Sequence, residues 1–264
     1  MLEQNNIKLA EVSTNIIDQK VDVYVQDLDE SKKNILNKLF NADAIRVFKG
    51  KPMVDNLSSF DKFRPLQAGV EIRTTDLEYS CTIGFLATDN NSSSTFLVTA
   101  GHCMHSTGEQ WGQGSPMYEL VATATRKVYS GSVDAAAMKV ADITNLSPKA
   151  FAYGTSAFTT FKYSQAADAD TVGDTVCSSQ GRANITQCGI LQTKSFSGKT
   201  EDGVAFSNLR KVNFKSISGD SGSPMWAGFT LMGVLKGNAG DDYVVYSHIA
   251  NVNRLLSVTP VLGY

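Results

Sequence analysis

This sequence has no long apolar run, no cluster of basic residues, and few cysteines, prolines or histidines. Its longest apolar runs, such as Phe96–Val98, are far shorter than the roughly 20 residues that cross a bilayer. Its 24 Lys and Arg residues are balanced by 26 Asp and Glu residues, and no window interleaves clustered basic residues with aromatic ones. We therefore expect no membrane and no nucleic acid as a partner.

The first residues also lack the basic start and the apolar stretch of a secretory signal peptide, so the chain as given contains none. What is present is a composition of 42% apolar residues with 21 glycines, typical of a turn-rich globular protein that buries a sizeable core.

The four cysteines form two local groups, Cys81 with Cys103 and Cys177 with Cys188. Neither group has the C-x-x-C spacing of a metal site, and we expect no metal and no organic cofactor. Four cysteines allow three disulfide connectivities, and free buried thiols are the alternative.

Two regions differ in their apolar pattern. Up to residue 50 the sequence predicts a β-α-β unit. A first strand is indicated by the alternating residues Val21, Val23 and Val25, and a second by Ile45 and Val47. Between them, Asp29, Glu30 and Ser31 indicate the start of a helix whose apolar face contains Ile35, Leu36, Leu39 and Phe40. The polar segment from Lys51 to Pro65 is predicted to be a linker. We therefore assign residues 1–67 to a small α/β unit with its linker, and residues 68–264 to a second domain.

The second domain has the pattern of an all-β protein. From Glu71 onward, short β-branched runs alternate with Gly, Ser, Asn and Asp at spacings of about 8 to 12 residues. Helical periodicity returns only over residues 249–256. This pattern indicates a β-barrel or β-sandwich with a C-terminal helix.

Two motifs in this domain carry chemistry. Gly219–Pro224 reads Gly-Asp-Ser-Gly-Ser-Pro, which indicates a strained turn that lifts the Ser221 hydroxyl to a surface while backbone amides face the same point. Thr99–Cys103 reads Thr-Ala-Gly-His-Cys and places His102 just after an apolar strand. A serine hydroxyl needs a neighbouring imidazole to take its proton, and the developing oxyanion needs fixed N–H donors. The two motifs together indicate a serine hydrolase.

These motifs resemble the chymotrypsin-like serine proteases of the alpha-lytic protease and streptogrisin type, over residues 68–264. The resemblance implies two six-stranded antiparallel β-barrels with the catalytic residues between them, in a secreted, monomeric endopeptidase that cleaves proteins or peptides. It also implies the disulfides Cys81–Cys103 and Cys177–Cys188, and hence an oxidising compartment. Residues 1–67 resemble part of the pro-region of this protease type, which would make the protease a partner of its own pro-region. An unrelated N-terminal extension or binding module is the alternative.

The same resemblance assigns the catalytic roles. His102 is the expected general base and Ser221 the nucleophile. Asp134 begins an apolar strand with small neighbours, so its buried carboxylate would need a donor such as the second nitrogen of His102. The order His, Asp, Ser is that of the chymotrypsin group. Four other carboxylates are predicted to be solvated turn residues: Asp142, Asp168, Asp170 and Asp174.

The backbone N–H groups of Gly219 and Ser221 are the expected oxyanion hole. Behind this turn, Asp220 needs a positive partner when buried. The stretch from Cys177 to Arg182 resembles the Cys-x-x-Gly-Arg loop of the bacterial enzymes with one extra residue, and it predicts an ion pair between Arg182 and Asp220.

The specificity pocket is predicted from the position of its walls relative to Ser221. Ser216, Leu235, Gly237 and Val244 are the expected substrate-binding residues, and they favour small or medium apolar side chains before the cut bond. Lys215 leaves a preference for Glu or Asp open. Lys236 stands where the family has a serine that donates to the catalytic Asp. A catalytically silent homologue that binds protein or glycan is the remaining alternative.

Overall fold

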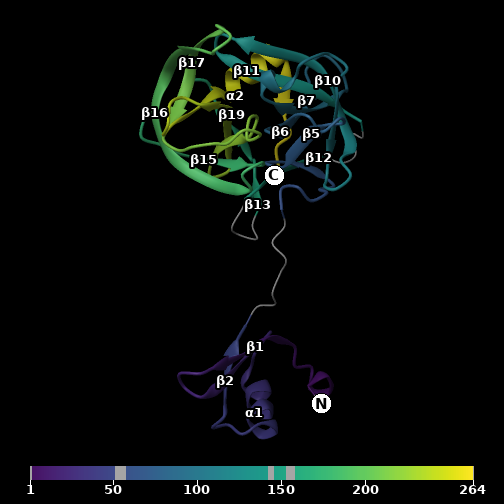
Figure 1. Ribbon diagram of the computed structural model, residues 1–264, viewed down its shortest axis with the longest axis vertical. Helices are drawn as coiled ribbons and strands as arrows, with labels where there is room; N and C mark the ends of the chain where they lie inside the picture. The colour runs from purple at the N-terminus through teal and green to yellow at the C-terminus, as the bar shows by residue number, and fades with distance from the viewer. Residues whose placement is uncertain (1, 51–57, 142–145, 153–157, 264) are drawn as a thin grey trace. The chain divides into compact units, whose positions relative to one another are not determined.

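The computed structural model describes residues 2–50, 58–141, 146–152 and 158–263, so Asp142 and the predicted linker residues 51–57 lie outside the described residues. The chain divides into two compact units, Met1–Asn56 and Leu57–Tyr264 (Figure 1). Residues 58–67, which the sequence assigns to the linker, belong to the second unit, where Ser59 and Leu66 are buried.

The first unit contains the predicted β-α-β arrangement and one further strand. Its elements are η1 (Glu3–Asn5), β1 (Leu9–Asn15), β2 (Lys20–Val25), α1 (Glu30–Leu39) and β3 (Ile45–Lys49). Strand β2 pairs in parallel with β3 and antiparallel with β1. Asp29 caps α1 by accepting a hydrogen bond from the Lys32 N–H at 2.8 Å. Strand β1 was not expected, because it buries no side chain fully and shows no clear apolar alternation.

The first large sheet of the second unit is antiparallel and has the order β21-β7-β8-β11-β10-β9-β5-β6. Its eight strands exceed the six expected, because the short strands β6 and β21 pair with the strands at its two ends. The strands are β5 (Glu71–Thr74), β6 (Ser80–Thr82), β7 (Phe85–Asp89), β8 (Thr95–Thr99), β9 (Gln110–Gln113), β10 (Glu119–Ser130), β11 (Val133–Val140) and β21 (Val258–Pro260).

The second large sheet has the order β14-β19-β18-β15-β16-β17-β20. Strand β20 also pairs with β19, so six antiparallel strands close a ring as predicted, while β14 adds a parallel edge. The strands are β14 (Tyr163–Ser164), β15 (Thr175–Gln180), β16 (Ile185–Lys199), β17 (Ala205–Val212), β18 (Pro224–Ala227), β19 (Thr230–Asn238) and β20 (Val244–His248).

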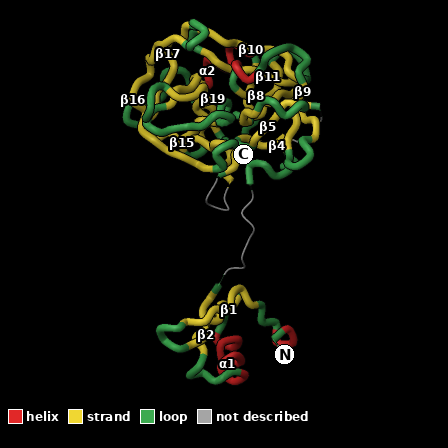
Figure 2. Tube along the Cα trace, in the orientation of Figure 1, coloured by secondary structure: helices red, strands yellow, loops and turns green. Residues whose placement is uncertain are grey.

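The remaining elements of this unit are short. Strands β4 (Leu66–Ala68), β12 (Leu146–Phe151) and β13 (Phe158–Thr160) form a small sheet in which β4 and β12 are parallel. One-turn helix η2 (Gly101–Cys103) follows β8, and α2 (Ile249–Leu256) lies at the predicted place near the C-terminus. Strands dominate this unit, as Figure 2 shows. None of the helices in the described residues is long and apolar enough to span a membrane.

Candidate active site

His102 is held at the point where strand β8 ends. All five residues of β8 are buried, and the chain then turns through η2, so the imidazole emerges from the core with about a third of its side chain exposed. The disulfide Cys81–Cys103 anchors the next residue to strand β6, as the resemblance implied. The second implied disulfide, Cys177–Cys188, links β15 to β16.

Asp134 lies directly behind His102. One carboxylate oxygen, Oδ2, is 2.8 Å from His102 Nδ1, and the other, Oδ1, accepts the His102 backbone N–H at 2.9 Å. The Asp134 side chain is completely buried. Burial raises the pKa of Asp134, but the hydrogen bond from His102 and the charges of His102 and Lys236 outweigh it and hold the pKa below its ordinary value. The ionised carboxylate therefore fixes the proton on Nδ1 and leaves Nε2 as the basic nitrogen.

Ser221 lies in a turn that packs against the strand end before His102. The Thr82 N–H donates to the Ser221 carbonyl at 2.9 Å, and a Cβ atom on Gly222 would come within 2.1 Å of Thr99 Oγ1. Gly222 also has a φ of 92°, so only glycine allows this close approach. The turn that holds Ser221 thus lies against the residues on either side of His102, Thr99 and Cys103.

Two N–H groups of this turn are free for a ligand. Within the described part of the chain, the backbone N–H groups of Gly219 and Ser221 donate to no protein acceptor, although the neighbouring N–H groups of Asp220 and Gly222 do. Gly219 has a φ of 96°, and its carbonyl accepts a hydrogen bond from Thr82 Oγ1 at 2.9 Å. This conformation is the one that the oxyanion-hole prediction requires of Gly219.

The predicted ion pair between Arg182 and Asp220 is not formed. Arg182 instead donates to Glu71 at 3.1 Å, where the completely buried carboxylate also accepts from Arg73. Asp220 accepts from the N–H groups of Ala183 and Ile217, at 2.8 and 2.9 Å. Burial raises the pKa of Asp220, and these N–H groups and the nearby charge of Arg182 only partly offset it. Backbone N–H groups therefore hold the Asp220 carboxylate, while the guanidinium of Arg182 is hydrogen-bonded to Glu71.

Lys236 occupies the position where a serine was expected, and it does contact the predicted catalytic carboxylate. Its ammonium nitrogen lies 2.8 Å from Asp134 Oδ2, and its side chain is largely buried. The Lys236 carbonyl accepts from Ser221 Oγ at 3.4 Å. A serine in the neighbouring strand β20 was not predicted: Ser247 Oγ accepts the Asp134 backbone N–H at 2.8 Å. Its position within strand β20 gave no signal in the sequence.

The four predicted pocket residues differ in their surroundings. A cavity of about 490 Å³ beside His102 is lined by Tyr129, Lys236, Gly237 and the β16–β17 hairpin, so Gly237 faces it. Leu235 and Val244 are completely buried in the core of the second sheet. Ser216 is nearly buried and is paired with Asn238, which accepts from its N–H and Oγ at 3.0 Å and donates to its carbonyl at 2.8 Å. Asn238 was missed, because only the fold brings these two segments together.

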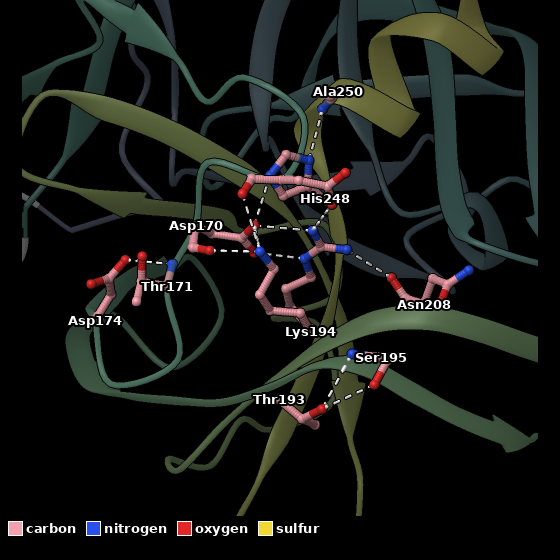
Figure 3. Close-up of polar contacts among 11 residues, drawn as sticks. Asp170, Thr171, Asp174, Thr193, Lys194, Ser195, Asn208, His248 and Ala250 are labelled. Atoms are coloured by element: carbon pink, nitrogen blue, oxygen red, sulfur yellow. Dashed lines mark hydrogen bonds and ion pairs between the residues drawn. The ribbon is translucent and has the colours of Figure 1, made fainter.

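One carboxylate predicted to be solvated is in fact buried. Asp170 lies among Lys194 and His248 (Figure 3), and its oxygens accept from Arg210 Nε at 2.7 Å and Nη2 at 3.1 Å. Arg210 and Lys194 lower the pKa of Asp170 to about 2 against the opposing effect of its burial, the largest single influence. Sequence neighbours of Asp170 are polar, but its partners come from strands β16 and β17. Within the described ranges, no group of three or more His, Cys, Asp or Glu side chains is arranged to hold a metal ion.

No protein-family model and no curated protein sequence matches the chain. Solved structures do match it. A protease of Nocardiopsis aligns with 74% of this chain and 97% of its own, with 23% identity and a TM-score of 0.63. Protease A of Thermobifida fusca aligns with 75% of this chain and 98% of its own, with 24% identity and a TM-score of 0.63. A glutamic acid-specific serine protease that uses a histidine triad in substrate binding aligns with 74% of this chain and all of its own, with 18% identity and a TM-score of 0.62.

This chain has the fold of the chymotrypsin-like serine proteases. In this chymotrypsin-like unit, Asp134 lies in β11 of the first large sheet and His102 in η2, which follows β8 of that sheet. Lys236 lies in β19 of the second large sheet, and Ser221 lies in the turn before β18. The candidate site therefore lies where elements of the two large sheets meet.

Proposed function

We propose that this chain is a secreted serine endopeptidase that hydrolyses peptide bonds through an acyl-enzyme. The observation that carries the proposal is the buried Asp134 carboxylate 2.8 Å from His102 Nδ1, beside the turn that holds Ser221. The fold, which is that of serine proteases, supports the same conclusion. The two disulfides support an oxidising, extracellular location.

In this mechanism, His102 Nε2 takes the proton of Ser221 Oγ as the oxygen attacks the substrate carbonyl. The N–H groups of Gly219 and Ser221 receive the oxyanion that forms. His102 then gives its proton to the leaving amine, and water releases the acyl group by the reverse sequence. Asp134 holds the imidazole in the required tautomer and stabilises the imidazolium.

The preferred substrate has a small or medium apolar residue before the cut bond. Gly237 and Asn238 line the cavity beside His102, and Asn238 is hydrogen-bonded to Ser216. Leu235 and Val244 are buried in the apolar core of the same sheet, and this apolar setting supports the preference. Lys215, which would support an acidic preference, has a side chain 64% exposed and pairs with Asp242 at 3.2 Å. A charge so placed is screened by solvent.

A fluorophosphonate probe tests the catalytic assignment. We expect covalent labelling of Ser221 in the wild-type protein and none in Ser221→Ala, with peptide hydrolysis reduced on the order of 10⁶-fold in that variant. Mass spectrometry of the labelled peptide identifies the site. Absence of labelling in the folded wild-type protein would instead support a silent homologue that binds without cleaving.

Matched peptides test the specificity. We expect peptides with Ala, Val, Leu or Met before the cut bond to be hydrolysed faster than the matched Glu peptide, with differences of about 10- to 200-fold among the apolar side chains. The Lys215→Ala variant should keep this order. A Glu preference that disappears in Lys215→Ala would overturn the apolar assignment.

A further inference from the structure

Lys236 brings a positive group to the carboxylate that orients His102. Its Nζ and His102 Nδ1 are both 2.8 Å from the same oxygen, Asp134 Oδ2. A serine hydroxyl at this position would donate a hydrogen bond without charge. The side chain of Lys236 is only 14% exposed, so water screens its charge weakly.

The ammonium group of Lys236 also contacts two aromatic rings. Lys236 Nζ lies 4.3 Å from the centre of the Phe206 ring and 4.9 Å from that of Tyr129. These two rings contact each other edge to face at 5.3 Å. Cations are attracted to ring faces at such distances, and the attraction grows when water is excluded. The ammonium group is therefore held by three contacts, one with a carboxylate and two with aromatic rings.

The two aromatic rings come from separate strands of the second unit. Tyr129 belongs to β10 of the first sheet and Phe206 to β17 of the second, and an isolated β-bridge pairs Phe206 with Gly131, the residue that follows β10. Besides Tyr129, the other titratable side chains that line the adjoining cavity are His102, Lys199 and Glu201. Lys199 and Glu201 are exposed and opposite in charge, so Lys236 is the cation that acts on Asp134.

We propose that Lys236 is a positioning residue of this active site. Its ammonium group holds Asp134 ionised and in place. It also keeps His102 in its neutral, basic form at a lower pH than Asp134 alone would allow. The proposal rests on the proposed protease function. A fixed positive charge beside the carboxylate opposes the second positive charge that protonation of His102 would add. The same charge leaves the buried carboxylate paired while His102 is neutral, when it would otherwise lack a charged partner.

The pH dependence of kcat/KM for a cleaved peptide tests this inference. In Lys236→Met, which keeps the length of the side chain and removes the charge, we expect the acid limb of the profile to move up by about one pH unit. Lys236→Arg should retain the wild-type limb. Lys62→Met is the matched control, because it removes an ammonium group from an ion pair with Glu119 in which both side chains are about half exposed; its profile should be unchanged.

A second variant covers the case in which Lys236→Met does not fold. Phe206→Leu removes one of the two ring contacts and keeps the lysine, so water reaches the ammonium group. The acid limb of the kcat/KM profile should then move in the same direction by a smaller amount. An acid limb that stays in place in both folded variants would overturn the inference. Fluorophosphonate labelling of the wild-type protein separates the outcomes: without labelling the proposed function fails, and with labelling but no shift only the role of Lys236 fails.

Discussion

At the scale of single residues, the charges around the nucleophile turn are distributed differently from the expected pattern. Glu71 is the buried anion that collects them: it accepts from Arg73, Arg182 and Ser80 through one oxygen and from the Tyr118 hydroxyl through the other. Burial and the neighbouring carboxylate raise the pKa of Tyr118 to about 12, which keeps this hydroxyl a donor. Glu71 is therefore paired with two arginine side chains, whereas Asp220 accepts hydrogen bonds from backbone N–H groups.

Two substitutions test this distribution. Glu71→Ala leaves Arg73 and Arg182 without their anion, and we expect the free energy of unfolding to fall by about 3 kcal/mol. Arg182→Ala removes a side chain that is 40% exposed and leaves Glu71 paired with Arg73, so a loss of about 1 kcal/mol is expected. Chemical denaturation at neutral pH gives both values. If Arg182→Ala proved the more damaging change, its charge would serve Asp220 after all.

At the scale of elements, strands β16, β17 and β20 contribute to a second group of ionisable side chains, which includes Lys194, His248 and Asp170 (Figure 3). His248 ends β20 and caps α2 by accepting the Ala250 N–H at 3.2 Å. Its other ring nitrogen, Nε2, is buried and has no hydrogen-bond partner within the described residues. Burial, reinforced by the charge of Arg210, lowers the pKa of His248 to about 4.

This depressed pKa predicts a loss of stability in acid. Between pH 6.5, the ordinary value for histidine, and about 4, the unfolded chain binds a proton that the folded chain does not. As the pH is lowered across this window, the free energy of unfolding should therefore decrease, by up to about 3 kcal/mol from His248 alone. Urea titrations at several pH values measure it. His248→Asn is the control, since Asn can still cap the helix but cannot titrate; parallel pH curves for the two proteins would contradict the prediction.

At the scale of the whole molecule, the chain combines a small α/β unit with a chymotrypsin-like unit of two large sheets. Each has a hydrophobic core of its own, and that of the first unit is built from residues such as Val23, Val25 and Leu36. We propose that the first unit is part of a pro-region that is removed during maturation. The alternative is a module that stays attached to the enzyme.

Processing distinguishes these possibilities. We expect the mature, secreted protein to lack the first unit, and Ser221→Ala to retain it if the enzyme cuts its own chain. Mass spectrometry of both secreted proteins reads the N-terminus directly. A wild-type protein that keeps residues of the first unit after prolonged incubation, while it cleaves peptides, would show that the unit is a permanent module.

The sequence alone determined what depends on short stretches of chain: the β-α-β unit, the helix over residues 249–256, and the residue types around His102, Asp134 and Ser221. Local patterns of this kind report which face of an element is buried. Only the tertiary structure decided that Arg182 pairs with Glu71, that Asp170 is buried, and that Lys236 contacts Asp134. In each of these pairs, the partners are separated by at least 40 residues in the chain. The partner of a long charged side chain depends on how remote strands are brought together, and no local pattern encodes that.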